Sequence, residues 1–204
     1  MDQDRSEFQS MDRKDFWEER WQSQQTGWDI GYPSPAIVSF IEKNIDPSSK
    51  ILIPGCGNAY EAEYLSNKGF KNITLIDIAP KAVAILKEKF QDFSSIEIYN
   101  EDFFDFSNSN FDLVVEQTFF CAIPPSVRPN YAMKMAEILK ENGELVGLLF
   151  NREFEQEGPP FGGTVEEYIE IFNPYFDILK IEICGNSIPP RQGNELWIHF
   201  KKKR

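Results

Sequence analysis

Short continuous runs of apolar residues alternate along the chain with stretches in which apolar residues recur every three to four positions. A continuous run is typical of a buried strand, and the longer period is typical of a helix with one apolar face. Strands that alternate with helices predict a parallel sheet covered by helices. The expected strands are 51–53, 72–77, 95–99, 111–116, 144–150, 176–184 and 195–201, and the expected helices are 35–44, 58–68, 80–90, 128–140, 164–172 and one that begins at residue 12.

The end of the chain breaks this alternation, because no helix separates the last two expected strands. Two such strands pair antiparallel, since a parallel pair needs a long crossover. We therefore expect an α/β fold with a mostly parallel sheet, an antiparallel C-terminal strand pair and helices on both faces. Residues 12–204 are expected to form one domain with an N-terminal lid segment at 12–34, and residues 1–11, polar and without periodicity, are expected to be a disordered tail.

The stretch from Lys50 to Leu65 combines an apolar strand, a glycine turn and the start of a helix. Gly55 and Gly57 permit a tight turn and let a ligand approach the backbone. Such a pair also occurs as a plain strand-to-helix turn. A dinucleotide fingerprint requires a third glycine where this chain has Tyr60, which speaks against NAD.

Acidic residues stand at the ends of three successive parallel strands, where ligands of such sheets bind. Asp77, twenty residues after Gly57, suits both hydroxyls of a ribose or, alternatively, the cap of the next helix. Asp102 and Phe103 suit an exocyclic amine and a purine face, or else are a turn acid beside a core ring. Glu116 suits the cationic end of an amino-acid tail, or is a solvated loop acid. Three acids together favour a nucleoside with a free amino-acid tail.

Three of the four tryptophans, Trp17, Trp21 and Trp28, lie ahead of the first strand. Trp17 and Trp21 are four residues apart and so share one face of the helix expected to begin at Asp12. These rings either anchor the segment to the core or form an aromatic lid whose faces attract a cation.

The chain has 204 residues and a formal net charge of −12, so neither nucleic acid nor an anionic membrane is expected as a partner. No apolar stretch approaches the roughly 20 residues that span a bilayer, and no signal peptide is recognisable. The cysteines, Cys56, Cys121 and Cys184, are widely spaced, which predicts neither a disulfide framework nor a zinc site. We expect a cytoplasmic monomer that binds no metal.

Further motifs carry a resemblance to a known family. They are Trp28-Asp29-x-Gly31, Pro54-Gly55-Cys56-Gly57, Phe119-Phe120-Cys121-Ala122-Ile123 and Gly158-Pro159-Pro160-Phe161. With Trp17 and Trp21 they resemble the thiopurine S-methyltransferase family of class I S-adenosylmethionine-dependent methyltransferases, and most of all its branch of thiol and halide methyltransferases. The resemblance covers roughly residues 15–204, and its specificity lies in the combination of motifs.

The resemblance implies a Rossmann-like sheet of seven strands, S-adenosyl-L-methionine as cofactor and S-adenosyl-L-homocysteine as product. It implies methyl transfer to a small-molecule acceptor that is a soft nucleophile, such as a thiol, a thiopurine or a halide. The implied cofactor site consists of Trp17, Trp21, Trp28, Pro54, Gly55, Cys56, Gly57, Asp77, Ile78, Asp102, Phe103 and Glu116. The implied acceptor pocket consists of Tyr32, Phe119, Phe120, Phe161 and Arg191.

The chain departs from related patterns at two places. Ile53 stands where many methyltransferases carry an acid before the first glycine, so the backbone and Glu116 would supply the contacts to the amino-acid tail. Ile123-Pro124-Pro125-Ser126 lacks the amide and the aromatic ring of the amino-group methyltransferase signature, so we reject that class.

Apart from acids, no general base is evident, because the one histidine, His199, stands on the last expected strand and is assigned a structural role. A thiol ionises appreciably near neutral pH and needs little base catalysis. Arg191 either holds an anionic acceptor or is a solvent-exposed turn residue. Two other functions stay open, an NAD-dependent oxidoreductase and a cofactor-binding regulatory protein without turnover.

Overall fold

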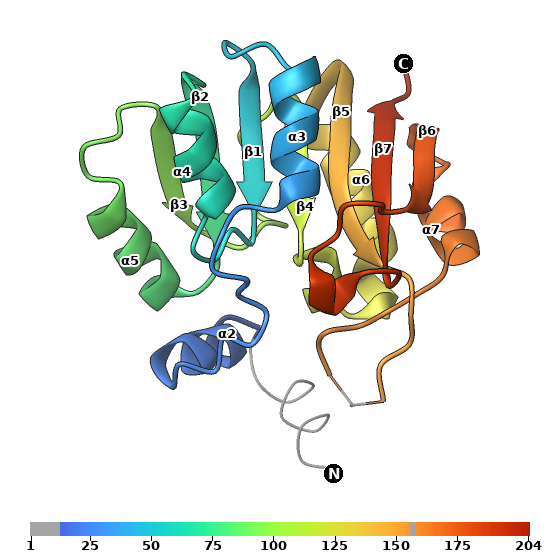
Figure 1. Ribbon diagram of the computed structural model, residues 1–204, viewed down its shortest axis with the longest axis horizontal. Helices are drawn as coiled ribbons and strands as arrows, with labels where there is room; N and C mark the ends of the chain where they lie inside the picture. Colours follow the sequence, from blue (N-terminus) through green and yellow to red (C-terminus); the bar gives the residue numbers. More distant parts are fainter. Residues whose placement is uncertain (1–12, 156–157) are drawn as a thin grey trace.

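The computed structural model describes residues 13–155 and 158–204, so the tail predicted at 1–11 and the helix start predicted at Asp12 lie outside the described residues. The described strands form one sheet in the order β3-β2-β1-β4-β5-β7-β6 (Figure 1). The strands are β1 (Lys50–Pro54), β2 (Asn72–Asp77), β3 (Ile96–Asn100), β4 (Phe111–Gln117), β5 (Leu139–Phe150), β6 (Phe176–Ile183) and β7 (Glu195–Lys202). The helices are α2 (Arg13–Gln22), α3 (Pro35–Asn44), α4 (Tyr60–Asn67), α5 (Pro80–Lys89), α6 (Arg128–Ile138) and α7 (Val165–Phe172), with short 3-10 turns at Phe120–Ala122, Pro125–Val127 and Pro189–Arg191.

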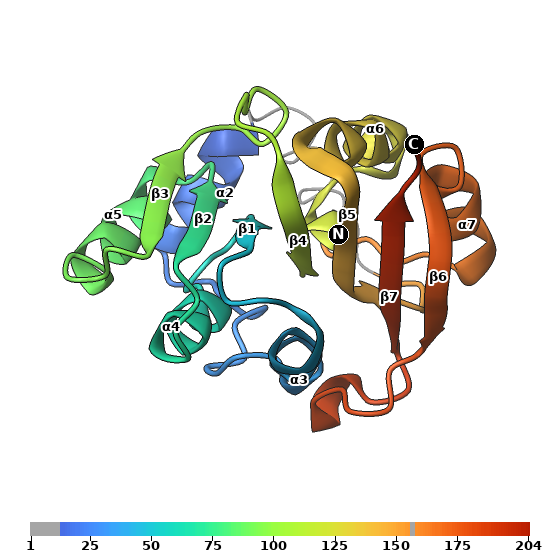
Figure 2. The ribbon, with the colours of Figure 1, turned by 90° about the horizontal axis from the view of Figure 1, so that it is seen from above.

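The pairing confirms the predicted fold. Strands β3, β2, β1, β4 and β5 pair in parallel, and β7 pairs antiparallel with both β5 and β6. Helices cover both faces of the sheet, with α3 and α4 on one side and α6 and α7 on the other (Figure 2). Each face therefore buries its own apolar layer. Ile37, Leu65 and Leu86 belong to the layer beneath α3, α4 and α5, and Tyr131 and Phe172 to the layer beneath α6 and α7.

Two of the boundaries that differ from the predicted ones have clear local reasons. Helix α4 begins at Tyr60 because the preceding residue, Ala59, has a left-handed backbone with φ +50°. Strand β5 begins at Leu139, which pairs with Phe111 before a shift in the β4–β5 register. The sequence predicted that this strand begins at Glu144, because the polar residues 140–142 do not have the apolar pattern of a buried strand.

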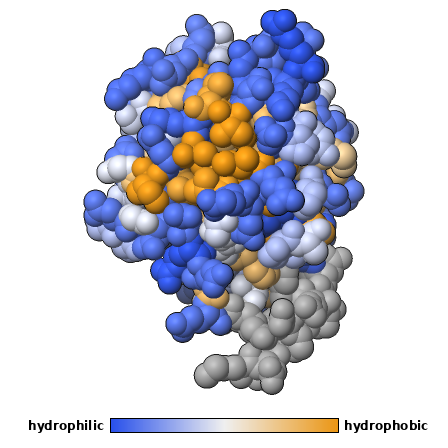
Figure 3. All heavy atoms as spheres, turned by 90° about the vertical axis from the view of Figure 1, so that its right-hand side faces the viewer, coloured by the Kyte–Doolittle hydropathy of each residue, from blue (hydrophilic) through white to orange (hydrophobic). Residues whose placement is uncertain are grey.

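The outer strand β6 carries exposed apolar side chains, and an apolar patch covers part of this side of the molecule (Figure 3). Leu179 and Ile183 on this strand are 52% and 50% exposed. The strand also carries an ion pair of 2.8 Å between Lys180 and Glu182 and a register shift between Ile178 and Lys180. Charges and bulges of this kind oppose edge-to-edge pairing of sheets.

Among the described residues, no helix is both long and apolar enough to cross a bilayer. All three cysteines are free thiols. His199 lies on β7, inside the sheet between β5 and β6, and its Nε2 is 3.0 Å from a carboxylate oxygen of Glu144.

Candidate active site

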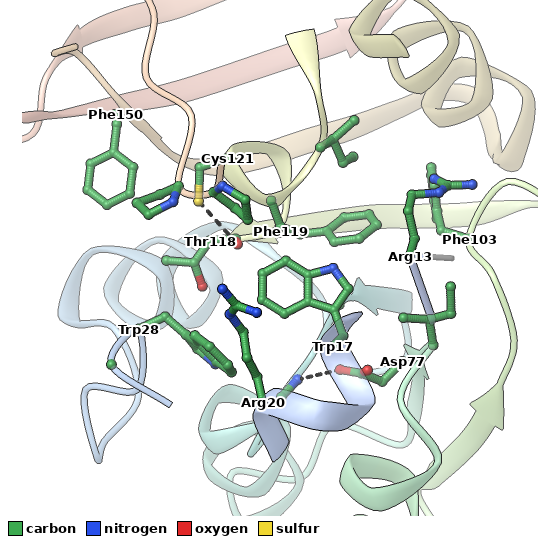
Figure 4. Close-up of a pocket in the computed structure, with 18 of the residues that line it drawn as sticks. Arg13, Trp17, Arg20, Trp28, Asp77, Phe103, Thr118, Phe119, Cys121 and Phe150 are labelled. Atoms are coloured by element: carbon green, nitrogen blue, oxygen red, sulfur yellow. Dashed lines mark hydrogen bonds between the residues drawn. The ribbon is translucent and has the colours of Figure 1, made fainter. Parts of the chain in front are cut away.

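A cavity of about 470 Å³ lies at the carboxyl ends of the parallel strands, between the sheet and helix α2 (Figure 4). Its wall combines segments that are far apart in the sequence. Trp17 comes from α2, Gly55 follows β1, and Asp77 is the last residue of β2. Thr118 follows β4, and Phe150 is the last residue of β5. This is the edge of the sheet at which the sequence predicted a ligand site.

The carboxylate of Asp77 is buried at the glycine turn. Its Oδ2 accepts a hydrogen bond from the backbone N–H of Gly57 at 3.1 Å, and its Oδ1 accepts one from the N–H of Ala79 at 2.9 Å. Burial raises the pKa of Asp77 to about 6, and these hydrogen bonds offset part of the rise. A carboxylate has about four acceptor positions, so Asp77 can still accept a hydrogen bond from a donor on a ligand.

Both oxygens of Asp102, just beyond β3, are engaged within the protein. Oδ1 accepts from the N–H of Phe104 at 2.9 Å, and Oδ2 lies 2.7 Å from the guanidinium of Arg13. This ion pair joins α2 to the end of β3. The neighbouring Phe103 and Ile78 line the cavity, and the Phe103 ring lies edge-on to Phe119 at 5.3 Å.

The three tryptophans of the N-terminal segment form one aromatic group on the cavity wall. The Trp28 ring centroid lies 5.4 Å from that of Trp17 and 6.1 Å from that of Trp21, both in edge-on contact. A Cβ at Gly57 would lie 3.7 Å from the Trp21 ring and 3.9 Å from Trp28 Nε1. The lid segment therefore covers the glycine turn, and Arg20 of α2 points into the cavity between Trp17 and Trp28 (Figure 4).

The chain turns sharply after β4, because Thr118 has a φ of +58°, in the left-handed region that glycine favours. This turn brings Phe119 and Cys121 to the cavity. The Phe119 ring lies against Gly55, where any Cβ would overlap it, and Gly55 itself has a φ of +56°. The Cys121 Sγ is 3.3 Å from the Thr118 carbonyl oxygen, and burial raises the pKa of this thiol to about 12.

The structure contradicts the role predicted for Glu116. Its carboxylate is 1% exposed and is not among the described groups that line the cavity. Oε1 accepts from the N–H groups of Phe119 and Phe120, each at 2.8 Å, and Oε2 accepts from the Tyr131 hydroxyl. Side chains alternate along a strand, so Glu116 points into the core beneath α6 while Gln117 points to the opposite face. Burial raises the pKa of Glu116 to about 7.

Five other predicted residues also lie off the wall of this cavity, as far as the described residues define it. Phe120 is 1% exposed and packs in the core, because the same turn that exposes Phe119 buries its neighbour. Phe161 holds its loop in place through a backbone hydrogen bond of 2.7 Å, while the two prolines before it reach the wall. Tyr32 and Cys56 line a smaller adjoining cavity, and Pro54 is buried at the end of β1.

Arg191 lines the cavity from the loop between β6 and β7. Its Nη2 donates to the Trp28 carbonyl oxygen at 2.8 Å, and its Nη1 lies 3.3 Å from Oε1 of the buried Glu195. Arg191 therefore ties the lid segment to the start of β7. Nothing in the sequence indicated this contact, which joins residues 163 positions apart.

Sequence reasoning missed several residues of the wall, among them Arg20, Phe150 and Arg152. Two of them carried a usable signal. Phe150 is the last residue of an expected strand, and Arg20 lies three positions after Trp17 on the same helix face. Arg152 lies in an irregular loop and had none.

Known proteins of one family resemble this chain in sequence. The model of the thiopurine S-methyltransferase family matches residues 12–197. The chain is 34% identical over 191 residues to the probable thiol methyltransferase 2 of Arabidopsis thaliana. This match covers 91% of the chain and 84% of that protein. It is 31% identical over 191 residues to the thiocyanate methyltransferase 1 of the same plant, with the same coverage.

A solved structure shares the fold at much lower identity. It is the 1,6-didemethyltoxoflavin-N1-methyltransferase of Burkholderia thailandensis with bound 1,6-didemethyltoxoflavin and S-adenosylhomocysteine. The TM-score is 0.77 at 13% identity, and the match covers 98% of this chain and 91% of that one. The resemblance predicted from the motifs is confirmed: the chain belongs to the thiopurine S-methyltransferase family of S-adenosylmethionine-dependent methyltransferases.

Proposed function

We propose that the protein transfers a methyl group from S-adenosylmethionine to the sulfur of a small molecule, a thiol or a thiopurine, and that halides and similar soft anions are further acceptors. The observation that carries this proposal is the single cavity in which the buried Asp77, the glycine turn and the tryptophan lid meet the Phe119 loop. Relatives that are named thiol and thiocyanate methyltransferases support sulfur as the accepting atom.

The described residues fit the cofactor. We assign the ribose hydroxyls to Asp77, whose carboxylate can accept further hydrogen bonds beside its backbone contacts. The adenine ring is assigned to the wall formed by Ile78, Asp102 and Phe103. Because Arg13 already pairs with Asp102, this carboxylate would contact both the adenine ring and the helix α2 of the lid segment.

When bound, the cofactor supplies a methyl group on a positively charged sulfur. Trp17, Trp21 and Trp28 would present aromatic rings to that charge and exclude water from it. Phe119, Cys121 and Phe150 would hold the acceptor in line with the methyl group, and alignment of two reactants is the main contribution that the protein has to make.

The cavity wall supports an acceptor that arrives already ionised. No histidine lines the cavity among the described residues, since His199 lies on β7 beside Glu144. Arg20 points into the cavity and its guanidinium group favours an anion, whereas both Nη atoms of Arg191 already contact Trp28 and Glu195. A thiolate or halide needs no base to remove a proton, so this arrangement suits a soft anionic nucleophile.

Calorimetry with S-adenosylhomocysteine, followed by methyl-transfer assays with a panel of thiols, selenols, halides and thiopurines, tests the proposal. We expect micromolar binding and transfer to at least one sulfur acceptor. Preferential binding of NADH would instead support an oxidoreductase. Cofactor binding without transfer to any member of the panel would support a regulatory protein.

We also propose that the protein acts as a monomer in the cytoplasm. The charges and the register shift on the outer strand β6 support the monomer, because they oppose pairing with a second sheet. The free thiols of all three cysteines support a reducing compartment. Light scattering of the purified protein and imaging of a tagged chain in its host would test the two statements.

A further inference from the structure

A smaller cavity, about 50 Å³ in volume, adjoins the main one at the glycine turn. It lies between the lid segment, the end of β4 and the start of α4, and the two cavities share Trp28, Gly55, Gly57 and Thr118 in their walls. A ligand that follows the glycine turn out of the main cavity would therefore enter the smaller one.

Gln117 lines this smaller cavity with an unused hydrogen-bond acceptor. Its side-chain Oε1 is buried and has no hydrogen-bond partner among the described residues. Its backbone carbonyl is already engaged, because the Thr118 hydroxyl donates to it at 2.7 Å. Nearly all buried polar atoms in folded proteins are paired, so an orphaned acceptor beside a cavity indicates a donor on a ligand.

The other polar groups of this cavity favour a positive charge. Asp29 and Glu61 lie on its wall, and no basic side chain does among the described residues. Both acids are held in place by the protein. Asp29 accepts from the side-chain amide of Asn58 and from the Tyr60 hydroxyl, and Glu61, which is buried, accepts from the N–H of Ser34 at 2.8 Å. The site thus combines fixed negative charge with a free neutral acceptor.

We propose that the side-chain oxygen of Gln117 accepts a hydrogen bond from the ammonium group of the cofactor's amino-acid tail, an inference that rests on the proposed function. An ammonium group has three donors and a positive charge, which match the orphaned oxygen and the two acids. Gln117 takes the role that the sequence suggested for Glu116, one position away on the opposite face of β4.

Three ligands separate the parts of the cofactor in a calorimetric test. S-Adenosylhomocysteine carries both the ammonium and the carboxylate, its decarboxylated analogue keeps only the ammonium, and methylthioadenosine has neither. In Gln117→Met, which is close to glutamine in shape, the first two ligands should bind about tenfold more weakly and methylthioadenosine as before. The same substitution at the exposed Gln91 serves as the matched control and should change none of the three affinities.

Thermal unfolding without ligand gives a second readout. Since Gln117→Met removes an unpaired buried acceptor, the melting temperature of the ligand-free variant should be unchanged or raised, while the increase caused by S-adenosylhomocysteine should shrink. A lower melting temperature, failure of the variant to fold, an equal loss for methylthioadenosine, or a loss confined to the ligand with a carboxylate would overturn the role of Gln117. If the unaltered protein binds none of the three ligands, the proposed function itself fails.

Discussion

The carboxylate of Asp77 shows how one buried residue can link ligand binding to pH. Its pKa is raised to about 6 because burial disfavours the charged form. Hydroxyl groups that donate to this carboxylate favour the charged form again. A ligand with such groups therefore has to displace a proton at pH values below about 6, and its affinity must depend on pH there.

We expect S-adenosylhomocysteine to bind about tenfold more weakly at pH 5 than at pH 7.5, because Asp77 is mostly protonated at the lower pH. Calorimetry at both pH values measures this ratio. In Asp77→Asn the affinity at pH 7.5 should fall by about 1–3 kcal/mol, and the dependence on pH should disappear. An unchanged ratio in the variant would assign the titration to another group.

Glu116 should matter for stability through its hydrogen bonds rather than through its charge. Glu116→Ala leaves two backbone N–H groups and the Tyr131 hydroxyl without their acceptor, which should lower the free energy of unfolding by about 2–4 kcal/mol. Glu116→Gln should lower the free energy of unfolding much less, because an amide oxygen can still accept hydrogen bonds from both N–H groups. Urea unfolding at pH 7 compares the two variants, and equal losses would contradict this account.

At the scale of elements, polar contacts join the lid segment, which contains helix α2, to the rest of the protein near both ends of the segment. Arg13 pairs with Asp102, and Glu18 accepts from the N–H of Lys81 at the start of α5 at 2.7 Å. Beyond the helix, the Trp28 carbonyl accepts from Arg191. These polar contacts add to the apolar packing of α2, which buries Phe16 and Trp21. Both kinds of contact therefore hold the lid segment against the rest of the protein.

Arg191→Ala should loosen the lid rather than act only on anionic acceptors. We expect hydrogen exchange at residues 26–32 to rise severalfold, and transfer to neutral and anionic acceptors to fall together, because the Trp28 carbonyl loses its donor. Arg152→Ala is the control, since Arg152 shares the cavity wall but has no described contact with the lid. A loss restricted to anionic acceptors, with unchanged exchange, would restore the role predicted from the sequence.

At the scale of the whole molecule, the buried acids should make the ligand-free protein less stable as the pH rises. Between pH 5 and pH 8 the unfolded chain has already ionised its carboxyl groups, whereas Asp77 and Glu116, with pKa values of about 6 and about 7, still hold protons in the folded state. The free energy of unfolding should therefore fall by about 2–4 kcal/mol across this interval. Melting curves at several pH values test this, and Glu116→Gln should remove part of the slope.

The sequence predicted the sheet because its strands are apolar runs, and it placed Asp77 at the ligand edge because strand ends meet there. It could not assign Glu116 and Gln117 to the correct faces, since β4 is buried on both sides and shows no alternation of polar and apolar residues. The ties from Arg13 to Asp102 and from Arg191 to Trp28 span 89 and 163 positions. Contacts so distant leave no local pattern in the chain.

The buried thiol of Cys121 has a consequence for an enzyme that alkylates sulfur. With a pKa of about 12, only about one part in a hundred thousand of this thiol is ionised at pH 7, whereas a free thiol in water is ionised to a few per cent. We therefore expect the low ionisation of Cys121 to favour the sulfur of an incoming thiolate over the protein's own sulfur as the methyl acceptor. A cysteine on the cavity wall would then resist methylation by the bound cofactor.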